Sequence, residues 1–465
     1  MPVASEPSIV PAAPPPPPYP ASAVAWYATI LLAVLYWFSM LDRFIIGLMV
    51  DPIKQDLGLT DLQFGVLQGV AFSVTYSLIG LAAGALADRY SRRRLIWFSI
   101  TIWSLATAAG GLARNFAHLL VARICVGAGE ATLNPCASSM ITDLFPRARL
   151  TTALAVYAMG ATVGAGFAYL FGGAMVSAIA GLGPLHLPLL GEVRPWQATF
   201  FIVGLPGLVF ALLVFAMAEP ARRGARAVHE GGASVGRGIV RSYGAMWTFV
   251  RTQRRFFAYH YLGFGIAALV VTGAGAWFPA YMGRSFGWRA DRIGLYMGIT
   301  LIASGFVGKL VGGIAVDAMY KRGQRDAQFR WYGAALLGAT PLGVLAFTTG
   351  SPWLFLAFIG LFLTVTAPFM ACASAALNLV TPNELRGTGI ALFNAASGSI
   401  GTGLGPIVIA ALSDRVFAGP GVSSGAALGH GLAATVAIFC PIAAIFLMKG
   451  LRAMREAVVA AEAQA

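Results

Sequence analysis

Four ionisable residues stand inside apolar stretches of the sequence, where charged side chains are costly. Asp42 and Arg43 are neighbours in FSMLDRFIIGLMV, near the end of an apolar run that begins at about Ala23. Arg123 and Glu130 lie in ARICVGAGEATLNP, two helical turns apart and therefore on one face of a helix. A carboxylate in such surroundings can bind a proton, and an arginine can bind a carboxylate or phosphate group. Intramembrane ions of this kind indicate a functional site.

The composition indicates that these ions belong to a polytopic membrane protein. The 465 residues are 58% hydrophobic and only 11% charged, whereas about a quarter of the residues of soluble domains are charged. The four cysteines lie within apolar segments and the histidines are scattered, so we expect no disulfide framework, no metal site and no cofactor. The sequence has no Ser-His, paired-aspartate or HExxH constellation, which argues against an enzyme.

Twelve apolar runs are long enough to cross a bilayer as helices. They cover approximately residues 23–50, 62–87, 95–113, 117–140, 151–180 and 198–218, then 256–282, 291–318, 330–349, 352–379, 387–417 and 428–449. This layout predicts an all-α membrane protein with six-helix bundles at 23–218 and 256–449, related by a pseudo-two-fold axis. The remaining segments are predicted to be a disordered proline-rich tail (1–22), a linker with a possible amphipathic helix (219–255) and a C-terminal tail (450–465).

Arginine and lysine predict the orientation of the chain. They gather in the linker and in the loops on the same side as both termini, which places that side in the cytoplasm. This topology and the attraction to anionic membrane lipids account for the net charge of +14, so we expect no nucleic-acid partner. The preference for arginine and alanine over lysine suggests a bacterial protein, and therefore the inner membrane.

The four ions are predicted to share one cavity, because the first span runs outward and the fourth runs inward and both ion pairs then lie at similar depths. Asp42 can balance Arg123, and Glu130 can balance Arg43. We expect Asp42 and Glu130 to couple transport to protons. Further polar residues complete the predicted substrate-binding cluster with Arg43 and Arg123: Asn134 in the first half, and Asn378 and Asn394 in the second. A static ion quartet that holds two helices together is the alternative.

The segment GALADRYSRRRL, residues 84–95, resembles the loop signature of the major facilitator superfamily, with Ser91 where the family usually has glycine. A partial copy occurs at Gly313 and Asp317, and the pattern R-x-x-x-G-x-G begins at Arg123. The resemblance implies alternating access with a conformational latch, although an arginine-rich stop signal would look similar. The expected latch residues are Gly84, Asp88, Arg89, Arg92, Arg93 and Asp317.

LDRF in the first span, the segment from Gly65 to Arg94 and ARICVGAGEA together resemble the spinster branch of this superfamily. That resemblance implies a monomeric exporter of lysophospholipid or a sphingosine-1-phosphate-like amphiphile. Proton-coupled carriers of organic anions such as sugar acids, or of drugs, share much of this first half, and a receptor that transports nothing is a further alternative. Two residues stay open: Lys309 can pair with Asp317 or meet substrate, and His260 has no predicted role.

Overall fold

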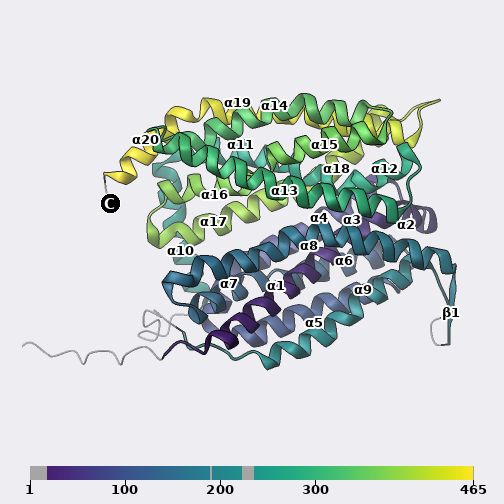
Figure 1. The fold of residues 1–465 in the computed structure, drawn as a ribbon, viewed down its shortest axis with the longest axis horizontal. Helices are drawn as coiled ribbons and strands as arrows, with labels where there is room; N and C mark the ends of the chain where they lie inside the picture. The colour runs from purple at the N-terminus through teal and green to yellow at the C-terminus, as the bar shows by residue number, and fades with distance from the viewer. Residues whose placement is uncertain (1–17, 189–190, 223–234, 464–465) are drawn as a thin grey trace, which may run out of the picture.

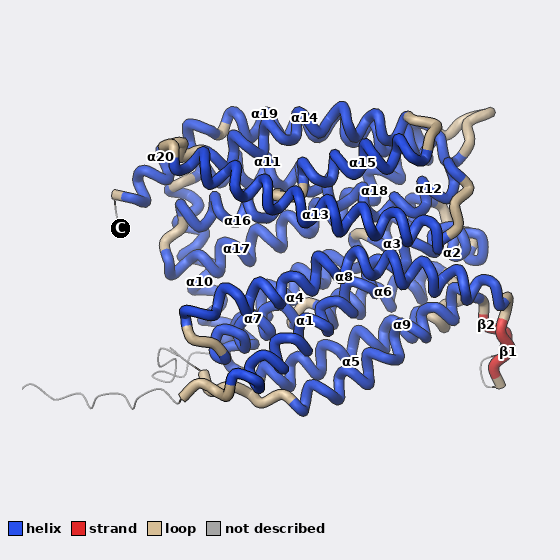
Figure 2. Tube along the Cα trace, in the orientation of Figure 1, coloured by secondary structure: helices blue, strands red, loops and turns tan. Residues whose placement is uncertain are grey.

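The computed structural model describes residues 18–188, 191–222 and 235–463. Within these ranges the regular elements are helices, apart from a short hairpin of β1 (Leu185–Leu187) and β2 (Gly191–Val193) (Figures 1 and 2). The predicted disordered tail falls almost entirely outside the described residues.

The first half of the chain contains six membrane-spanning units, several of them interrupted. Its elements are α1 (Ser22–Ile45), the 3-10 turn η1 (Ile46–Met49), α2 (Val50–Leu57), α3 (Asp61–Gln68), α4 (Val70–Arg89), α5 (Arg92–Gly110), α6 (Phe116–Glu130), α7 (Leu133–Leu144), α8 (Arg147–Leu182), α9 (Pro195–Leu213) and η2 (Val214–Ala216).

The second half follows after the linker helix α10 (Val235–Thr252). Its elements are α11 (Arg254–Gly273), the 3-10 turn η3 (Ala274–Trp277), α12 (Phe278–Phe286), α13 (Ala290–Lys321), α14 (Ala327–Thr348), α15 (Pro352–Thr366), α16 (Phe369–Val380), α17 (Asn383–Gly398), the π-helical η4 (Ser399–Leu404), α18 (Gly405–Leu412), the π-helical η5 (Ser413–Phe417), α19 (Ser424–Lys449) and α20 (Leu451–Glu462).

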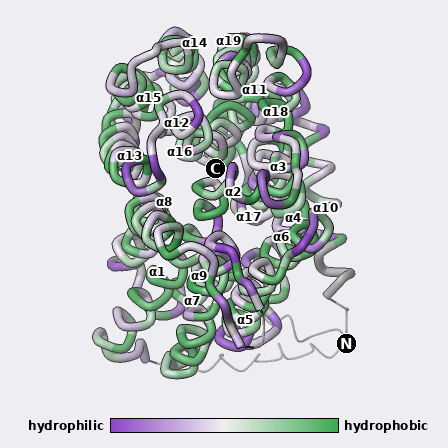
Figure 3. Tube along the Cα trace, turned by 90° about the vertical axis from the view of Figure 1, so that its right-hand side faces the viewer, coloured by the Kyte–Doolittle hydropathy of each residue, from purple (hydrophilic) through white to green (hydrophobic). Residues whose placement is uncertain are grey.

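Eleven helical segments of the described chain are long and apolar enough to cross a membrane. Helix α5 is not one of these eleven segments, and its first turn holds Arg92, Arg93 and Arg94, which lower its hydropathy. Large apolar side chains such as Val121, Leu212 and Phe306 are more than half exposed, as expected for surfaces that face hydrocarbon. Figure 3 shows the hydrophobic helices and, between them, the more hydrophilic connecting segments.

The two halves repeat each other in their helix breaks. Each begins with a long helix, a four-residue 3-10 turn and a short helix: α1, η1 and α2 in the first half, and α11, η3 and α12 in the second. The fourth span of each half is also broken by two residues, between α6 and α7 and between α15 and α16. Equivalent positions in the two halves can therefore be identified by their distance from these breaks.

The molecule has two distinct ends. The hairpin end carries α2, α12 and the β-hairpin, and the linker end carries α10 and α20 (Figure 1). At the linker end, α10 buries Met246 and exposes Val240 and Trp247, and the amphipathic character of the linker stays a prediction. The Tyr243 hydroxyl of α10 donates to the Leu81 carbonyl, which attaches the linker helix to the first half.

Glycines let the two halves approach closely along two seams. A Cβ atom on Gly69 would lie 2.3 Å from the Gly403 carbonyl oxygen, where α3 and α4 meet η4. A Cβ on Gly173 would lie 2.3 Å from the carbonyl oxygen of Ala290, where α8 meets α13. Any larger residue would push these helices apart, so the glycines set the spacing between the halves.

Candidate functional site

The Arg43–Glu130 ion pair joins α1 to the end of α6. The Arg43 Nε donates to Glu130 Oε2 at 2.6 Å, and the Ser39 hydroxyl donates to the same oxygen at 2.6 Å. The Glu130 side chain is fully buried, whereas the Arg43 side chain is 24% exposed. The Arg43 guanidinium carbon also lies 4.8 Å from the ring centre of Phe72 and 4.7 Å from that of Tyr76, within cation–π range.

The second pair, Asp42 and Arg123, is looser. The Arg123 Nη1 lies 3.9 Å from Asp42 Oδ2, beyond hydrogen-bond distance, and both side chains are almost fully buried. The Thr107 hydroxyl donates to Asp42 Oδ1 at 2.8 Å, but Asp42 Oδ2 and two Arg123 nitrogens have no hydrogen-bond partner among the described residues. The charged form of a buried ion pair is poorly stabilised when some of its polar atoms lack hydrogen-bond partners. Such a pair can readily change its partner or its protonation state.

The local sequence explains why these side chains meet. Asp42 and Arg43 fall in the last turn of α1, immediately before the 3-10 turn, and Glu130 is the final residue of α6. Gly127 lets α6 pack directly on α4, because a Cβ there would lie 2.3 Å from the Phe72 carbonyl oxygen. Close packing of α6 on α4 brings the Phe72 and Tyr76 rings against the Arg43 guanidinium.

Asn134 joins the cluster, whereas Asn378 and Asn394 do not. The Asn134 side chain bonds Tyr76 and Tyr157, which sequence reasoning did not single out. Asn378 in α16 and Asn394 in α17 make no side-chain hydrogen bond to the ion cluster within the described ranges. Among the described residues, the two asparagines of the second half thus have no hydrogen bond to the four ions, and their part in substrate binding stays a prediction.

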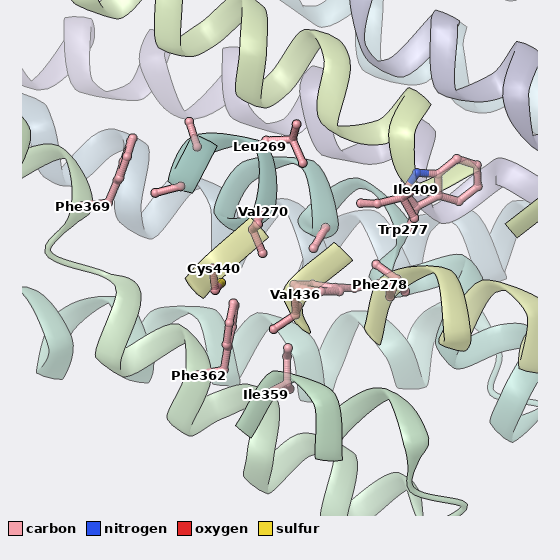
Figure 4. Packing of buried hydrophobic residues seen from close by; sticks show 14 of the residues in the cluster. Leu269, Val270, Trp277, Phe278, Ile359, Phe362, Phe369, Ile409, Val436 and Cys440 are labelled. Atoms are coloured by element: carbon pink, nitrogen blue, oxygen red, sulfur yellow. The ribbon is translucent and has the colours of Figure 1, made fainter. Parts of the chain in front are cut away.

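The equivalent positions of the second half are apolar or uncharged. Asp42 and Arg43 stand four and three residues before η1, and Val270 and Val271 stand four and three residues before η3. The places that Arg123 and Glu130 have in α6 are taken in α15 by Ile359 and Thr366. Figure 4 shows Val270 and Ile359 packed among other apolar side chains. The ion cluster is therefore a feature of one half and not a requirement of the repeat.

At the linker end, the arginine-rich segment is organised by a glutamate that the sequence reading missed. Glu219 accepts hydrogen bonds from the Ser91 hydroxyl at 2.6 Å and from the backbone N–H groups of Arg92 and Arg93, at the N-terminus of α5. Partial burial raises the pKa of the Glu219 carboxyl, but these hydrogen bonds outweigh burial, and the net pKa is lowered. Glu219 is far in sequence from Ser91, Arg92 and Arg93, so no local sequence pattern indicates that they are in contact.

The expected latch residues are only partly connected. The buried Arg92 bonds Glu219, Asp143 and the Pro220 carbonyl, so it fastens α5 to α7 and to the end of the α9 segment within the first half. The Arg93 Nη1 donates to the Met217 carbonyl at 3.1 Å. Gly84 and Arg89 are exposed, and the side chain of Asp88 lies outside the described residues. Asp317 is exposed and forms no ion pair with any residue that the structure describes.

At the hairpin end, an ion cluster connects the two halves. Arg284 of α12 donates to Asp51 at 2.7 and 2.9 Å and to both oxygens of Asp61 at 2.6 and 2.8 Å. Lys54 also pairs with Asp61, and the Asp414 carboxylate accepts the Leu62 N–H at 3.0 Å. We call Asp51, Asp61 and Arg284 the hairpin-end clamp. The sequence shows these charges at span ends, but nothing in it pairs residues so far apart.

Lys309 and His260 also have defined surroundings. The Lys309 ammonium donates to the Thr162 hydroxyl of α8 at 2.8 Å and forms no ion pair with Asp317. The contact crosses between the halves. His260 is fully buried among Phe256, Phe264 and other rings, and its Nε2 lies 2.9 Å from the Ala373 carbonyl oxygen. Its packing is that of a structural residue.

Comparison with known proteins agrees with this architecture. The Major Facilitator Superfamily model matches residues 32–406. An MFS-type efflux pump of Mycolicibacterium smegmatis is 27% identical, over 90% of this chain and 91% of its own. A hexuronate transporter of Bacillus subtilis is 26% identical, over 62% of this chain and 63% of its own.

A solved structure extends the likeness to the fold. The crystal structure of a bacterial homologue of the human lysosomal transporter spinster, inward-facing and unoccupied, matches with a TM-score of 0.79 and 26% identity, over 94% of this chain and 99% of that one. The predictions of a twelve-helix membrane fold, of a spinster-like carrier and of a transporter rather than an enzyme are confirmed. The chain belongs to the Major Facilitator Superfamily.

Proposed function

We propose that this protein is a proton-coupled secondary transporter that exports a lipid-like amphiphile, such as a lysophospholipid or a sphingosine-1-phosphate-like lipid. The observation that carries the proposal is the ion cluster of Asp42, Arg43, Arg123 and Glu130. It is buried in the first half, while the equivalent positions of the second half are Val270, Val271, Ile359 and Thr366. One half thus holds titratable groups and the other offers an apolar wall.

Proton coupling follows from the way each carboxylate depends on a single arginine. Protonation of Glu130 would remove the charge that holds Arg43, and protonation of Asp42 would do the same for Arg123. An arginine released in this way is free to bind an anionic substrate, and a carboxylate that has lost its arginine holds its proton more tightly. Proton binding and substrate binding then favour the same state of the cluster, in which the arginine is separated from its carboxylate.

An amphiphile suits both halves of the site. Arg43 is the most exposed member of the ion cluster, and its guanidinium can donate two parallel hydrogen bonds to a phosphate. The second half offers few polar groups at the equivalent depth and many aromatic and aliphatic ones, which suits a hydrocarbon chain. The resemblance of the sequence to the spinster branch implies this substrate class, and the likeness to a bacterial spinster homologue supports that branch.

Alternating access would proceed by rocking of the two halves around this site. The arginine-rich loops favour a cytoplasmic linker end with both termini inside, in a bacterial inner membrane. The hairpin-end clamp would then close the outer side in the present structure, and the segment with Gly84, Asp88 and Asp317 would latch the opposite state. Export is favoured by the likeness to an efflux pump. We propose that the carrier works as a monomer among membrane lipids.

A second candidate is the proton-coupled transport of a small organic anion such as a sugar acid. The relative named a hexuronate transporter favours it, and a carboxylate could use the same arginines. The two candidates differ in what the second half must recognise, because a sugar acid needs polar partners for its hydroxyl groups.

The distinguishing experiment uses purified protein in liposomes with an imposed pH gradient. A trace of labelled lysophospholipid and a labelled hexuronate are followed side by side, with Glu130→Gln as the comparison. We expect gradient-driven movement of the lysophospholipid that the variant loses. Movement of the hexuronate alone would support the second candidate, and movement of neither would contradict both.

A further inference from the structure

The break between α6 and α7 comes immediately after Glu130. Helix α6 ends at Glu130, α7 begins at Leu133, and Pro135 lies in the first turn of α7. Proline has no N–H group, so it cannot bond the Ala131 carbonyl as a helical residue would. Glu130 and Asn134 therefore stand on opposite sides of a point where the backbone is less constrained.

A chain of side chains runs around this break. The Tyr157 hydroxyl of α8 donates to Asn134 Oδ1 at 2.5 Å, and Asn134 Nδ2 approaches the Tyr76 hydroxyl at 3.4 Å. Tyr76 stands against the Arg43 guanidinium, which binds Glu130. Tyr157 is nearly fully buried, and its ring stacks on Tyr36 at 5.2 Å between centres. Five helices, α1, α4, α6, α7 and α8, thus meet in one connected set of polar groups.

The fold does not require this chain. The corresponding break of the second half, between α15 and α16, follows Thr366 and contains Pro368. The residue at the place of Asn134 there is Met370, which has no hydrogen-bonding amide. The nearby buried Tyr332 donates to the Thr366 backbone carbonyl at 3.3 Å and makes no contact with an ion. A helix break of this kind is therefore stable without a chain of side chains that leads to a charge.

We propose that Tyr157 and Asn134 are positioning residues which, through Tyr76, hold the Arg43 guanidinium against Glu130 and so set the pH at which the carrier changes conformation. The inference rests on the proposed proton coupling at Glu130. An arginine held close to a carboxylate favours the charged form of that carboxylate, and a loosened arginine favours it less.

Titratable and charged groups from every adjoining element contribute to this environment: Tyr36, Asp42 and Arg43 from α1, Tyr76 from α4, Arg123 from α6, Cys136 from α7 and Tyr157 from α8. The facing side chains of α5, Trp103 and Thr107, carry no charge.

The test measures the pH midpoint of the conformational change, using spin labels on Gln55 of α2 and Val422, exposed residues of the two halves at the hairpin end. Protein in lipid nanodiscs is titrated, and the label distance distribution is followed. For Tyr157→Phe we expect the midpoint to move to higher pH by about half to one unit, the effect of losing roughly one hydrogen bond. Asn134→Leu should move it in the same direction.

Tyr332→Phe is the matched control, since it removes a buried tyrosine hydroxyl beside the equivalent break of the second half. Its midpoint should equal that of the wild type. A wild-type midpoint in Tyr157→Phe and Asn134→Leu would overturn the inference while leaving proton coupling standing, and so would an equal shift in Tyr332→Phe. If the label distances in the wild type do not change with pH, the proposed proton coupling is contradicted, and the inference fails with it.

Discussion

Arg43 is the residue at which the chemistry of the site converges. It holds the buried Glu130, lies over two aromatic rings and keeps part of its side chain accessible. Asp42, its neighbour in sequence, points instead to Thr107 and Arg123. Two adjacent residues of one helix thus supply ions to two separate pairs, which allows two protonation steps in one small volume.

Replacing Asp42 by Asn should remove one of these steps while preserving the fold, because an amide oxygen can still accept the Thr107 hydrogen bond. We expect uptake driven by a pH gradient to fall to the level of gradient-free exchange in liposomes. Asp291→Asn, which changes an exposed carboxylate at the start of α13, is the control and should behave as the wild type. Unchanged gradient dependence in Asp42→Asn would exclude Asp42 from coupling.

Glu219 gives a pH-dependent contribution to stability at the linker end. Its lowered pKa means that the folded state favours the carboxylate, so the stabilisation is present at neutral pH and disappears as the pH falls through the folded-state pKa. Glu219→Gln should lower the free energy of unfolding at pH 7 by about 1–3 kcal/mol, the value of a charged hydrogen bond. Thermal unfolding in detergent, measured from neutral pH to below pH 4, checks this.

The difference between wild type and Glu219→Gln should shrink in acid, because the wild-type carboxyl is then also neutral. Glu192→Gln, at an exposed carboxylate of β2, is the control. A difference that is constant across the pH range would show that the Glu219 charge is not the cause.

At the scale of elements, glycine contacts hold α6 against α4 and so place Glu130. Gly127→Ala would bring a methyl group within 2.3 Å of the Phe72 carbonyl oxygen, and we expect a destabilisation of about 1–3 kcal/mol from overpacking, with weakened transport. Gly80→Ala in α4 is the matched control, because no atom lies within 4 Å of its added Cβ. Thermal unfolding of both variants is the measurement, and we expect a lower melting temperature for Gly127→Ala than for Gly80→Ala. Equal melting temperatures would contradict the packing argument.

The sequence predicted the spans and the shared depth of the four ions, because hydropathy and charge are local properties. It did not predict the helix breaks after Ile45 and Glu130, because the two breaks share no proline or glycine pattern that would identify them in the sequence. The partners Tyr76 and Tyr157 of Asn134 were also missed, because tyrosines in spans are commonly interpreted as lipid-facing or core residues. Their role depends on helix rotation, which tertiary packing decides.

For the whole molecule, the hairpin-end clamp is an ion-pair connection between the two halves at one end. Arg284 of the second half is nearly buried and forms ion pairs with Asp51 and Asp61 of the first half. Sequence reasoning placed the latch only at the other end, because its residues resemble a known signature, whereas the clamp joins charges that are distant in sequence. Its partners become visible only when the halves are assembled.

Arg284→Gln should therefore favour states in which the hairpin end is open. Removing one partner of a buried ion pair is costly to the state that contains it, and we expect at least about a tenfold gain in the open population. The label distance between Gln55 and Val422 reports this population. Arg415→Gln, an exposed arginine at the same end, is the control. An unchanged distribution in Arg284→Gln would show that the clamp does not hold the closed state.

The most direct test of the proposed coupling measures proton movement itself. Liposomes that contain the protein and a pH-sensitive dye are given an outward gradient of lysophospholipid, without any imposed pH gradient. If the movement of each substrate is coupled to that of a proton, the pH of the lumen should change with the wild type and remain unchanged with Glu130→Gln. Transport of the lysophospholipid by the wild type without a change in lumen pH, or an equal change with both proteins, would contradict proton coupling at Glu130.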